Sequence, residues 1–280
     1  MEALLLAGGF GTRLAPLTNI LPKCLMPIHG RPLLGLWLEM LQRAGTTKVF
    51  INLHYLAPMV EGYVLNSPYR SIVEFYHEPE LLGTAGTLRG LKDKFSSNDL
   101  MVVHADNLSV FDAAAYRSAF ESRPEGCHIT MMTFTTDEPQ SCGIVTLDQE
   151  GRIIHFAEKP TDYIGNHANG AVYLMHLPDV MPAIDACPMA NDISTEILPL
   201  FIGKMNGFHN HVYHRDIGNV PALCAAQKEI TQLDTALELI DCVIPYWSEN
   251  KARNIIKAEL VQSLIHSGVD AQTIEYFTIN

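Results

Sequence analysis

Apolar runs and helical patterns alternate along the first part of the chain. Short apolar runs bounded by polar or glycine-rich segments are typical of buried strands, and broader apolar patterns with a period near 3.6 are typical of helices. Strands are predicted at 4–7, 49–53, 72–76 and 100–104, and helices at 32–44, 58–65 and 85–91. This alternation indicates a parallel sheet with helices on its faces.

Later in the chain, strand-like runs follow one another and then give way to a helical stretch. Strands are predicted at 128–135, 143–147, 153–158 and 168–175, and apolar residues recur at helical spacings from Pro221 to about Ser267. We expect an α/β fold, a Rossmann-like, mixed and mainly parallel sheet flanked by helices. A C-terminal helical appendage over 221–280, for packing or dimerisation, follows a domain over 1–220.

The first predicted strand runs into a glycine-rich segment that we expect to bind a polyphosphate. Three glycines, Gly8, Gly9 and Gly11, let the backbone turn sharply and present successive N–H groups to an anion. Arg13 and Lys23 add two cations. The spacing fits neither a dinucleotide fingerprint, because Leu14 stands at the third glycine position, nor a P-loop, because Thr-Arg follows Gly11.

The net charge and the spacing of the cysteines exclude some classes of partner and site. A net charge of −12 argues against nucleic acid or an anionic membrane as a partner. No apolar run approaches the length of a membrane span, and the N-terminus enters a strand without a basic leader. Six widely spaced cysteines without a C-x-x-C pair predict buried free thiols, so we expect a cytoplasmic protein.

The glycine-rich segment, together with motifs further along the chain, resembles the signature of the sugar-1-phosphate nucleotidyltransferases. The resemblance begins with Leu-Ala-Gly-Gly-x-Gly-Thr-Arg-Leu-x-Pro-Leu-Thr and Pro-Lys-x-Leu-x-Pro. It continues in the family's order through Leu82-Gly83-Thr84-Ala85-Gly86, Ala105-Asp106-Asn107, Glu158-Lys159-Pro160, Asn169-Gly170-Ala171-Val172-Tyr173 and Asp216-Ile217-Gly218. Mannose-1-phosphate and heptose-1-phosphate guanylyltransferases look most similar.

The resemblance implies a role for each motif. It makes 1–220 a catalytic domain for transfer of a nucleotide from an NTP to a sugar 1-phosphate, with Arg13 and Lys23 on the phosphates and Asp106 and Asp216 as catalytic ligands of Mg²⁺. The implied nucleotide-binding residues are Leu6, Ala7, Gly8, Gly9, Gly11, Thr12, Gly83, Thr84 and Ala85. The implied sugar-phosphate residues are Glu158, Lys159, Asn169 and Gly170. A homodimer is left open.

Base and sugar are less fixed by the motifs than the reaction. We favour GTP and a mannose- or heptose-like 1-phosphate. The alternatives are uridylyl or thymidylyl transfer to a glucose-type 1-phosphate, a non-catalytic nucleotide-sugar-binding regulatory subunit, and a phosphocholine cytidylyltransferase. His104 and Ala105 precede Asp106 where most relatives have glycine next to the aspartate. We interpret Glu78 as a surface charge, and the histidines at 209, 211 and 214 as alternating along one strand.

Overall fold

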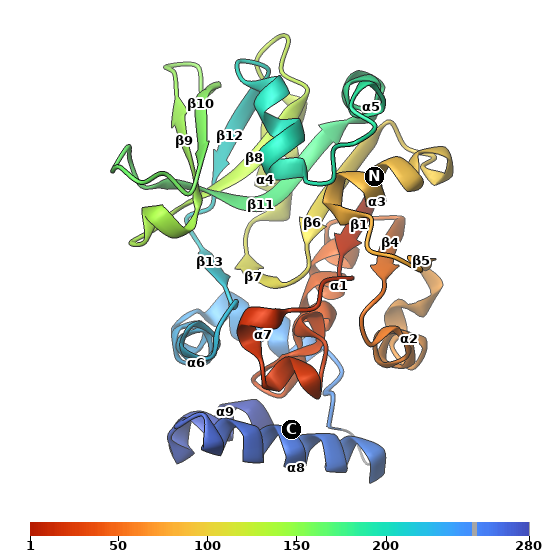
Figure 1. The fold of residues 1–280 in the computed structure, drawn as a ribbon, viewed down its shortest axis with the longest axis vertical. Coiled ribbons are helices and arrows are strands. Elements are labelled where there is room, and N and C mark those ends of the chain that lie inside the picture. The colour runs from red at the N-terminus through yellow and green to blue at the C-terminus, as the bar shows by residue number, and fades with distance from the viewer. Residues whose placement is uncertain (248–250, 280) are drawn as a thin grey trace.

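A mixed sheet forms the centre of the molecule (Figure 1). The computed structural model describes residues 1–247 and 251–279, and nine strands of these residues pair in the order β10-β9-β11-β6-β1-β4-β5, with β8 joining β11 to β12. The strands are β1 (Glu2–Leu6), β4 (Lys48–Leu53), β5 (Val73–His77), β6 (Asp99–His104), β8 (Ile129–Thr135), β9 (Gly143–Leu147), β10 (Ile153–Glu158), β11 (His167–His176) and β12 (Met205–His209). β6, β1, β4 and β5 run parallel, whereas β11 is antiparallel to β6, β8 and β9. The predicted fold class is confirmed.

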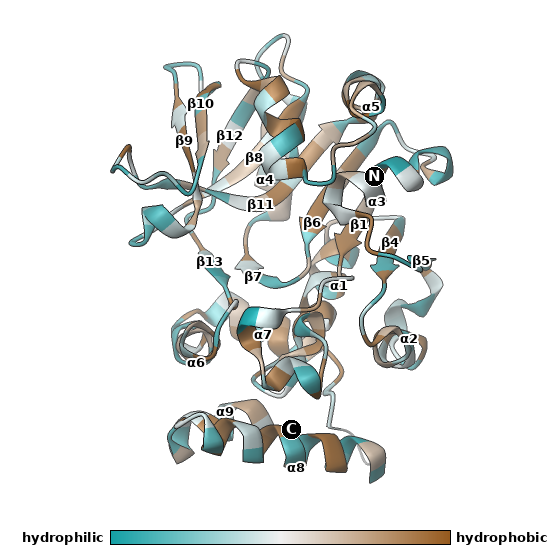
Figure 2. Ribbon diagram, in the orientation of Figure 1, coloured by the Kyte–Doolittle hydropathy of each residue, from teal (hydrophilic) through white to brown (hydrophobic). Residues whose placement is uncertain are grey.

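Helices cover both faces of this sheet and build two cores. They are α1 (Leu33–Arg43), α2 (Ala57–Leu65), α3 (Gly83–Gly90), α4 (Ala113–Glu121), α5 (Leu177–Ala186), α6 (Val220–Glu229), α7 (Asp234–Cys242), α8 (Lys251–His266) and α9 (Ala271–Thr278). Ala3 and Leu5 of β1 join the core formed with α1, α2, α4 and the C-terminal helices, while Leu4 and Leu6 join the core formed with α3 and α5. Because side chains of a strand alternate between faces, a strand covered on both sides is apolar throughout, as Figure 2 shows for β1.

Two short ribbons lie outside the main sheet, and the sequence pattern did not predict either. β2 (Pro27–Ile28) and β3 (Arg31–Pro32) form a hairpin, and β7 (Asn107–Val110) pairs antiparallel with β13 (Tyr213–Asp216). The second ribbon joins segments from the two halves of the chain. It extends from the sheet towards the helices below (Figure 1).

The C-terminal helices agree with the helical stretch predicted over 221–280. α8 ends at His266, next to the expected end of the helical spacings, and α9 follows it within the same stretch. In Figure 1, α8 and α9 lie at the end of the molecule away from the sheet. None of the described helices is both long enough and apolar enough to cross a bilayer.

Two smaller expectations were wrong. The histidines at 209, 211 and 214 do not share a strand, since β12 ends at His209 and β13 begins at Tyr213. Asn210 turns the chain between them, because its side chain accepts from the Val212 N–H at 3.0 Å and donates to the Tyr213 carbonyl at 2.8 Å. All six cysteines are free thiols, but only Cys24 and Cys127 are buried; Cys242, at the end of α7, is exposed, and the other three are half-buried.

Candidate active site

The glycine-rich loop leaves the carboxyl end of β1 and is held by a side chain of the neighbouring strand. The Asn52 Oδ1 atom on β4 accepts hydrogen bonds from the Ala7 N–H at 2.7 Å and the Gly8 N–H at 3.3 Å. Gly11 has a φ of +64°, and a Cβ there would lie 2.8 Å from the Thr18 Cγ2 atom. Conformation and packing therefore both require glycine at this position.

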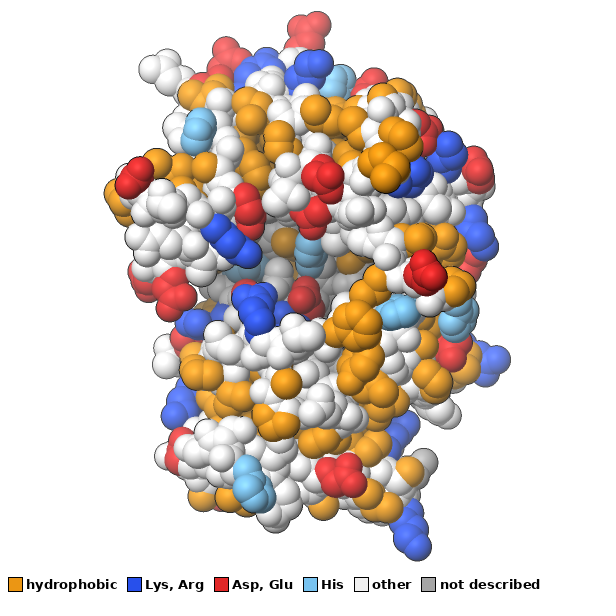
Figure 3. Space-filling view, in the orientation of Figure 1, with side chains coloured by type: hydrophobic (Ala, Val, Ile, Leu, Met, Phe, Trp, Pro, Cys, Tyr) orange, Lys and Arg blue, Asp and Glu red, His pale blue; other side chains and the backbone are white. Residues whose placement is uncertain are grey.

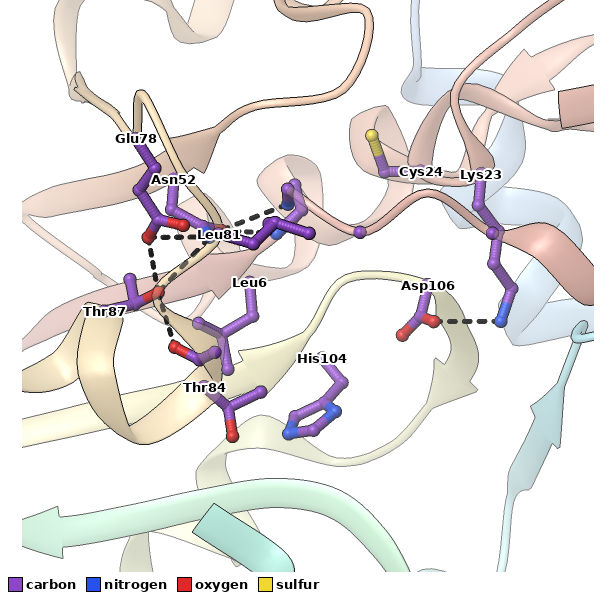
Figure 4. Close-up of a pocket in the computed structure, with 15 residues that line it drawn as sticks. Leu6, Lys23, Cys24, Asn52, Glu78, Leu81, Thr84, Thr87, His104 and Asp106 are labelled. Atoms are coloured by element: carbon purple, nitrogen blue, oxygen red, sulfur yellow. Dashed lines mark hydrogen bonds and ion pairs between the residues drawn. The ribbon is translucent and has the colours of Figure 1, made fainter. Parts of the chain in front are cut away.

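A cavity of about 230 Å³ opens beside this loop, at the carboxyl ends of β1, β4 and β6 (Figure 4). Ligands of open α/β sheets bind at this edge. The predicted site residues among its lining are Leu6, Ala7, Gly8, Gly9, Gly11, Lys23, Gly83, Thr84 and Asp106. Sequence reasoning did not assign to it Cys24, Asn52, Glu78, Leu81, Thr87 and His104, which also line it. Figure 3 shows the molecule hollowed across its middle, with charged side chains of both signs around the hollow.

Glu78 is a buried residue that links β4 to the segment from Leu82 to Thr87, so its interpretation as a surface charge was wrong. Its side chain is 4% exposed. Oε1 accepts from the Thr87 hydroxyl at 2.5 Å and from the Asn52 amide at 3.1 Å, and Oε2 accepts from the Leu82 N–H at 3.3 Å. Asn52 in turn holds the glycine-rich loop, and Thr87 lies on α3. A polar residue inside the apolar run 49–53 was the one sequence signal of this network.

Two residues expected to bind nucleotide lie outside the cavity lining. Ala85 is fully buried in the core under α3, and Thr12 lies in the turn after the glycines. Thr84 lines the cavity and also accepts a hydrogen bond from the Ile193 N–H at 2.7 Å. Gly83 starts α3 with a φ of +72°, and a Cβ there would lie 2.3 Å from the Asn191 carbonyl oxygen. The small residues of this motif thus allow close packing against the segment at 191–193.

The ribbon of β7 and β13 brings the two predicted metal carboxylates together. Asp106 precedes β7, Asp216 ends β13, and the pairing places Asp216 opposite Asn107. Lys23 lies between the carboxylates, with its Nζ atom 2.9 Å from Asp106 Oδ2 and 2.9 Å from Asp216 Oδ1. The Arg13 guanidinium, 71% exposed, contacts Asp216 Oδ2 at 3.4 Å. The four predicted catalytic residues therefore converge from four separate segments.

Charge pairing favours the ionised forms of Lys23 and Asp106. Burial alone lowers the pKa of Lys23, but attraction by Asp106 and Asp216 outweighs it, so the pKa lies above its ordinary value. Burial likewise raises the pKa of Asp106, but the Lys23 ammonium, with His104, brings it below its ordinary value. The Lys23 side chain is 6% exposed, whereas the two aspartates are 41% and 45% exposed. The carboxylates thus face the open side of the site.

The donor set at this point fits Mg²⁺. Two carboxylates with exposed oxygens, Asp106 and Asp216, share one ammonium partner, and such hard oxygen ligands suit a cation that also takes water and phosphate oxygens. Within the described part of the chain, no three His, Cys, Asp or Glu side chains gather into a metal-binding group. A complete protein cage is not what Mg²⁺ needs beside a polyphosphate.

The predicted sugar-phosphate residues lie on the antiparallel part of the sheet and do not line the 230 Å³ cavity. Ile144 of β9 pairs with both Ala157 and Ala168, so Glu158 and Asn169, each one residue further, lie at the same end of the sheet. The Asn169 amide donates to the Tyr173 hydroxyl at 2.8 Å.

Glu158 and Lys159 form only a loose pair at this end of the sheet. Lys159 has a φ of +47°, its side chain is 60% exposed, and its Nζ atom lies 4.0 Å from Glu158 Oε1. Burial raises the pKa of Glu158, although Lys159 opposes this. The predicted sugar-phosphate residues therefore lie on or next to β10 and β11, the two strands on either side of β9, and Glu158 and Lys159 are not tightly bonded to each other.

His104 lies between the two groups of residues. Its ring lines the cavity next to Asp106 (Figure 4) and approaches the Tyr173 ring edge-on, with 6.3 Å between centroids. Burial lowers the pKa of the imidazole, and its buried Nε2 atom has no hydrogen-bond partner among the described residues. Ala105 donates its N–H to the Leu6 carbonyl at 3.1 Å, so alanine in the family's glycine position continues the strand pairing.

Comparisons with known proteins agree with this geometry. The family model described as nucleotidyl transferase matches residues 2–233. A probable mannose-1-phosphate guanylyltransferase 1 of Oryza sativa subsp. japonica is 32% identical over 205 residues, which cover 71% of this chain and 55% of that protein. A mannose-1-phosphate guanyltransferase of Aspergillus oryzae is 32% identical over 225 residues, 78% of this chain and 61% of that protein. The chain thus spans little more than half the length of these curated relatives.

A solved structure supports the fold independently. The putative glucose-1-phosphate thymidylyltransferase from Bacillus anthracis, solved in complex with a sucrose, superposes with a TM-score of 0.71 at 20% identity, covering 82% of this chain and 94% of that one. The family match includes every predicted site residue, from Leu6 to Asp216. The family inferred from the motifs is therefore confirmed: this chain belongs to the nucleotidyl transferase family.

Proposed function

We propose that this protein is a sugar-1-phosphate nucleotidyltransferase, which transfers a nucleoside monophosphate from an NTP to a sugar 1-phosphate and releases pyrophosphate. The observation that carries the proposal is the Lys23 ammonium, 2.9 Å from each of Asp106 and Asp216 at the edge of a cavity formed by a glycine-rich loop. Two carboxylates, a buried cation and a loop of small residues suit a polyphosphate with its metal ion.

The reaction needs positioned charge rather than a protein nucleophile. A phosphate oxygen of the sugar 1-phosphate attacks the α-phosphorus, and the bond to the bridging oxygen of pyrophosphate breaks. Lys23 stabilises charge at the reacting phosphate. Arg13, whose exposed side chain contacts Asp216 at 3.4 Å, can turn onto the β- and γ-phosphates. Mg²⁺ held by Asp106 and Asp216 would neutralise phosphate charge when bound.

The second substrate lies on the sugar side in this proposal. Glu158 accepts hydrogen bonds from sugar hydroxyls, Lys159 binds the sugar phosphate, and Asn169 and Gly170 line the same place. The exposed Lys159 side chain and the loose contact with Glu158 leave both groups free to turn to a ligand. Gly9, beside which a Cβ would meet no atom within 4 Å, leaves room for the nucleotide.

We favour GTP as the donor and a mannose- or heptose-like 1-phosphate as the acceptor. The printed names of the plant and fungal relatives support this choice.

Two alternatives remain to be tested against this proposal. Uridylyl or thymidylyl transfer would use the same phosphate residues. A regulatory subunit that binds nucleotide sugar without turnover would not need Arg13, Lys23, Asp106 and Asp216 to converge, so their convergence favours the enzyme. We further propose that 1–220 is the catalytic domain, that the helices of 221–280 are an appendage, and that the protein acts in the cytoplasm. A homodimer stays open.

One assay separates these possibilities. Pyrophosphate release is measured with Mg²⁺ while GTP, UTP, dTTP, CTP and ATP are each combined with hexose-, amino-sugar- and heptose-1-phosphates. We expect release with GTP and a mannose- or heptose-type phosphate. Release with UTP or dTTP alone contradicts the choice of base. No release from any pair, with nucleotide binding still seen by calorimetry, favours the regulatory subunit.

A further inference from the structure

The C-terminal helices contact the hairpin that follows Lys23. Lys23 begins a short 3₁₀ turn, and its carbonyl accepts the Met26 N–H at 3.0 Å. The Met26 carbonyl accepts the Leu33 N–H at 3.1 Å, across the base of the β2–β3 hairpin. The position of the Lys23 backbone therefore depends on where this hairpin lies.

The Gln227 side chain of α6 makes hydrogen bonds to backbone groups of the β2–β3 hairpin. Its side chain is fully buried. The Nε2 atom donates to the Pro27 carbonyl at 2.7 Å, and Oε1 accepts from the His29 N–H at 3.0 Å. The Gln227 carbonyl oxygen also lies 2.9 Å from His29 Nε2. One amide side chain thus pairs with the hairpin much as a neighbouring strand would.

Residues after position 233, where the family match ends, contact the turn between β2 and β3 from the side opposite Gln227. His29 and Gly30, with φ of 48° and 71°, form the turn. The Tyr246 N–H donates to the Gly30 carbonyl at 3.2 Å, and the Ile279 carbonyl packs so close to Gly30 that a Cβ there would lie 1.6 Å from it. The centroids of the Tyr276 and His29 rings are 5.0 Å apart. Because the match ends at residue 233, these contacts belong to a part of the chain outside it.

Helix α6 also contacts β13, the strand that ends at Asp216. Glu229 of α6 accepts from Arg215 Nε at 2.6 Å and from the Tyr213 hydroxyl at 2.8 Å. Arg215 is the residue before Asp216. Gln227 and Glu229, two positions apart on α6, therefore bind the segments that supply the two partners of the Lys23–Asp216 ion pair.

We propose that α6, supported by the helices after it, is a positioning element for the reaction, with Gln227 as the positioning residue for Lys23 and Glu229 for Asp216. The appendage then sets the distance between an essential cation and an essential carboxylate. This inference rests on the proposed function for its kinetic part. It has a structural part, the placement of Lys23, that can be measured without turnover.

The test replaces Gln227 by Met, which keeps the length of the side chain and removes the amide. We expect kcat to fall about tenfold at saturating substrates while the KM of each substrate changes less than about twofold, because misplacing a catalytic group slows the reacting step. Glu229→Gln, at a half-buried position, should lower kcat about threefold. Leu223→Ala is the matched control, since Leu223 is fully buried on the same helix and makes no side-chain hydrogen bond; it should lower Tm and leave kcat unchanged.

The placement of Lys23 can be measured without enzyme activity. Lysines are acetylated with limiting acetic anhydride, and the extent of acetylation at each lysine is determined by mass spectrometry. In the unaltered protein, Lys23 should react much more slowly than the exposed Lys204. Gln227→Met should raise the ratio of Lys23 to Lys204 acetylation at least about threefold, and Leu223→Ala should not. An unchanged ratio, or equal kinetic effects of Gln227→Met and Leu223→Ala, overturns the positioning role. Inactivity of the unaltered protein with every substrate pair contradicts the proposed function instead, and the acetylation ratio still decides this inference.

Discussion

Two parts of the candidate site are built differently: the predicted nucleotide side, which is the glycine-rich loop with residues 78–87, and the predicted sugar side, which is residues 158–159 and 169–170. On the nucleotide side, loops leave the parallel strands β1, inside the sheet, and β5, at one edge, and a buried network of Asn52, Glu78 and Thr87 ties them together. On the sugar side, Glu158 and Lys159 end a strand at the edge of the sheet, 4.0 Å apart, and the lysine is largely exposed. Side-chain hydrogen bonds tie the first side together, whereas the second has only the loose contact between Glu158 and Lys159.

This difference predicts how changes on each side will behave. Buried hydrogen bonds are costly to break, so substitutions on the nucleotide side should affect stability and binding together. Exposed charges contribute little to stability, so substitutions on the sugar side should affect binding alone. Asp106, Asp216 and Lys23 are proposed to act on the reacting phosphates and their metal ion, so substitutions there should affect turnover most.

The largest effect is expected from Asp106→Asn and Asp216→Asn. Each change removes a charged oxygen ligand suited to Mg²⁺ and one partner of Lys23, so we expect kcat to fall about 100-fold or more. The measurement is pyrophosphate release over a range of Mg²⁺ concentrations, with circular dichroism to show that the fold is kept. Near-normal turnover in either variant would remove that aspartate from the metal site.

Lys159→Ala should have the next largest effect, on the sugar side alone. Loss of the ammonium removes a phosphate contact, so we expect the KM for the sugar 1-phosphate to rise about tenfold and Tm to stay constant, since the side chain is 60% exposed. Lys204→Ala, another exposed lysine, is the control and should change neither. A change confined to the KM of the nucleotide would assign Lys159 to the other substrate.

Thr87→Val should combine a stability effect with a smaller binding effect. The valine leaves Glu78 without its 2.5 Å donor, which should lower the free energy of unfolding by about 1–2 kcal/mol and raise the KM for the nucleotide about threefold. Thr130→Val is a matched control, because Thr130 is also fully buried and donates to Asn206 Oδ1 at 2.8 Å in another part of the protein. It should cost similar stability without a change in KM. If both variants bind nucleotide equally, the network does not shape the site.

The same contrast explains what the sequence could predict. Short-range features were predictable: the parallel strands of the first half, the turn at the glycines after β1, and the placement of Asp106 after a strand all follow from local patterns. The motifs implied the catalytic residues by resemblance, and the structure brings four of them together. Contacts between distant segments were not predictable, because nothing in a local pattern says which strands become neighbours.

Glu78 and α6 show this limit most clearly. A glutamate after a strand looks like a solvated charge, and only the approach of Thr87 and Asn52 makes it a buried acceptor. The helical spacing beyond Pro221 predicted helices correctly, but the pattern contains no sign that Gln227 pairs with the peptide groups of Pro27 and His29. Polar residues in apolar surroundings were the only trace of both networks.

The smallest expected effect concerns pH: the KM for the sugar 1-phosphate and the KM for the nucleotide should depend on pH differently. Burial raises the pKa of Glu158, whereas Lys23, against the effect of burial, holds that of Asp106 below its ordinary value. For stability, Glu158 favours folding below its unfolded pKa of about 4.3, and this contribution is lost as pH rises through the higher folded pKa. Binding has the opposite sign, because hydroxyl groups donate better to the ionised carboxylate.

As pH falls from about 7 to 5, we therefore expect the KM for the sugar 1-phosphate to rise in the unaltered protein. This rise should be about two- to threefold larger than any rise in the Glu158→Gln variant. The sugar phosphate itself titrates near pH 6, but it does so with both proteins, so the ratio of their KM values isolates Glu158. The KM for the nucleotide should show no such divergence, since Asp106 stays ionised throughout this range. Equal profiles for the two proteins would mean that Glu158 does not accept hydrogen bonds from the sugar as a carboxylate.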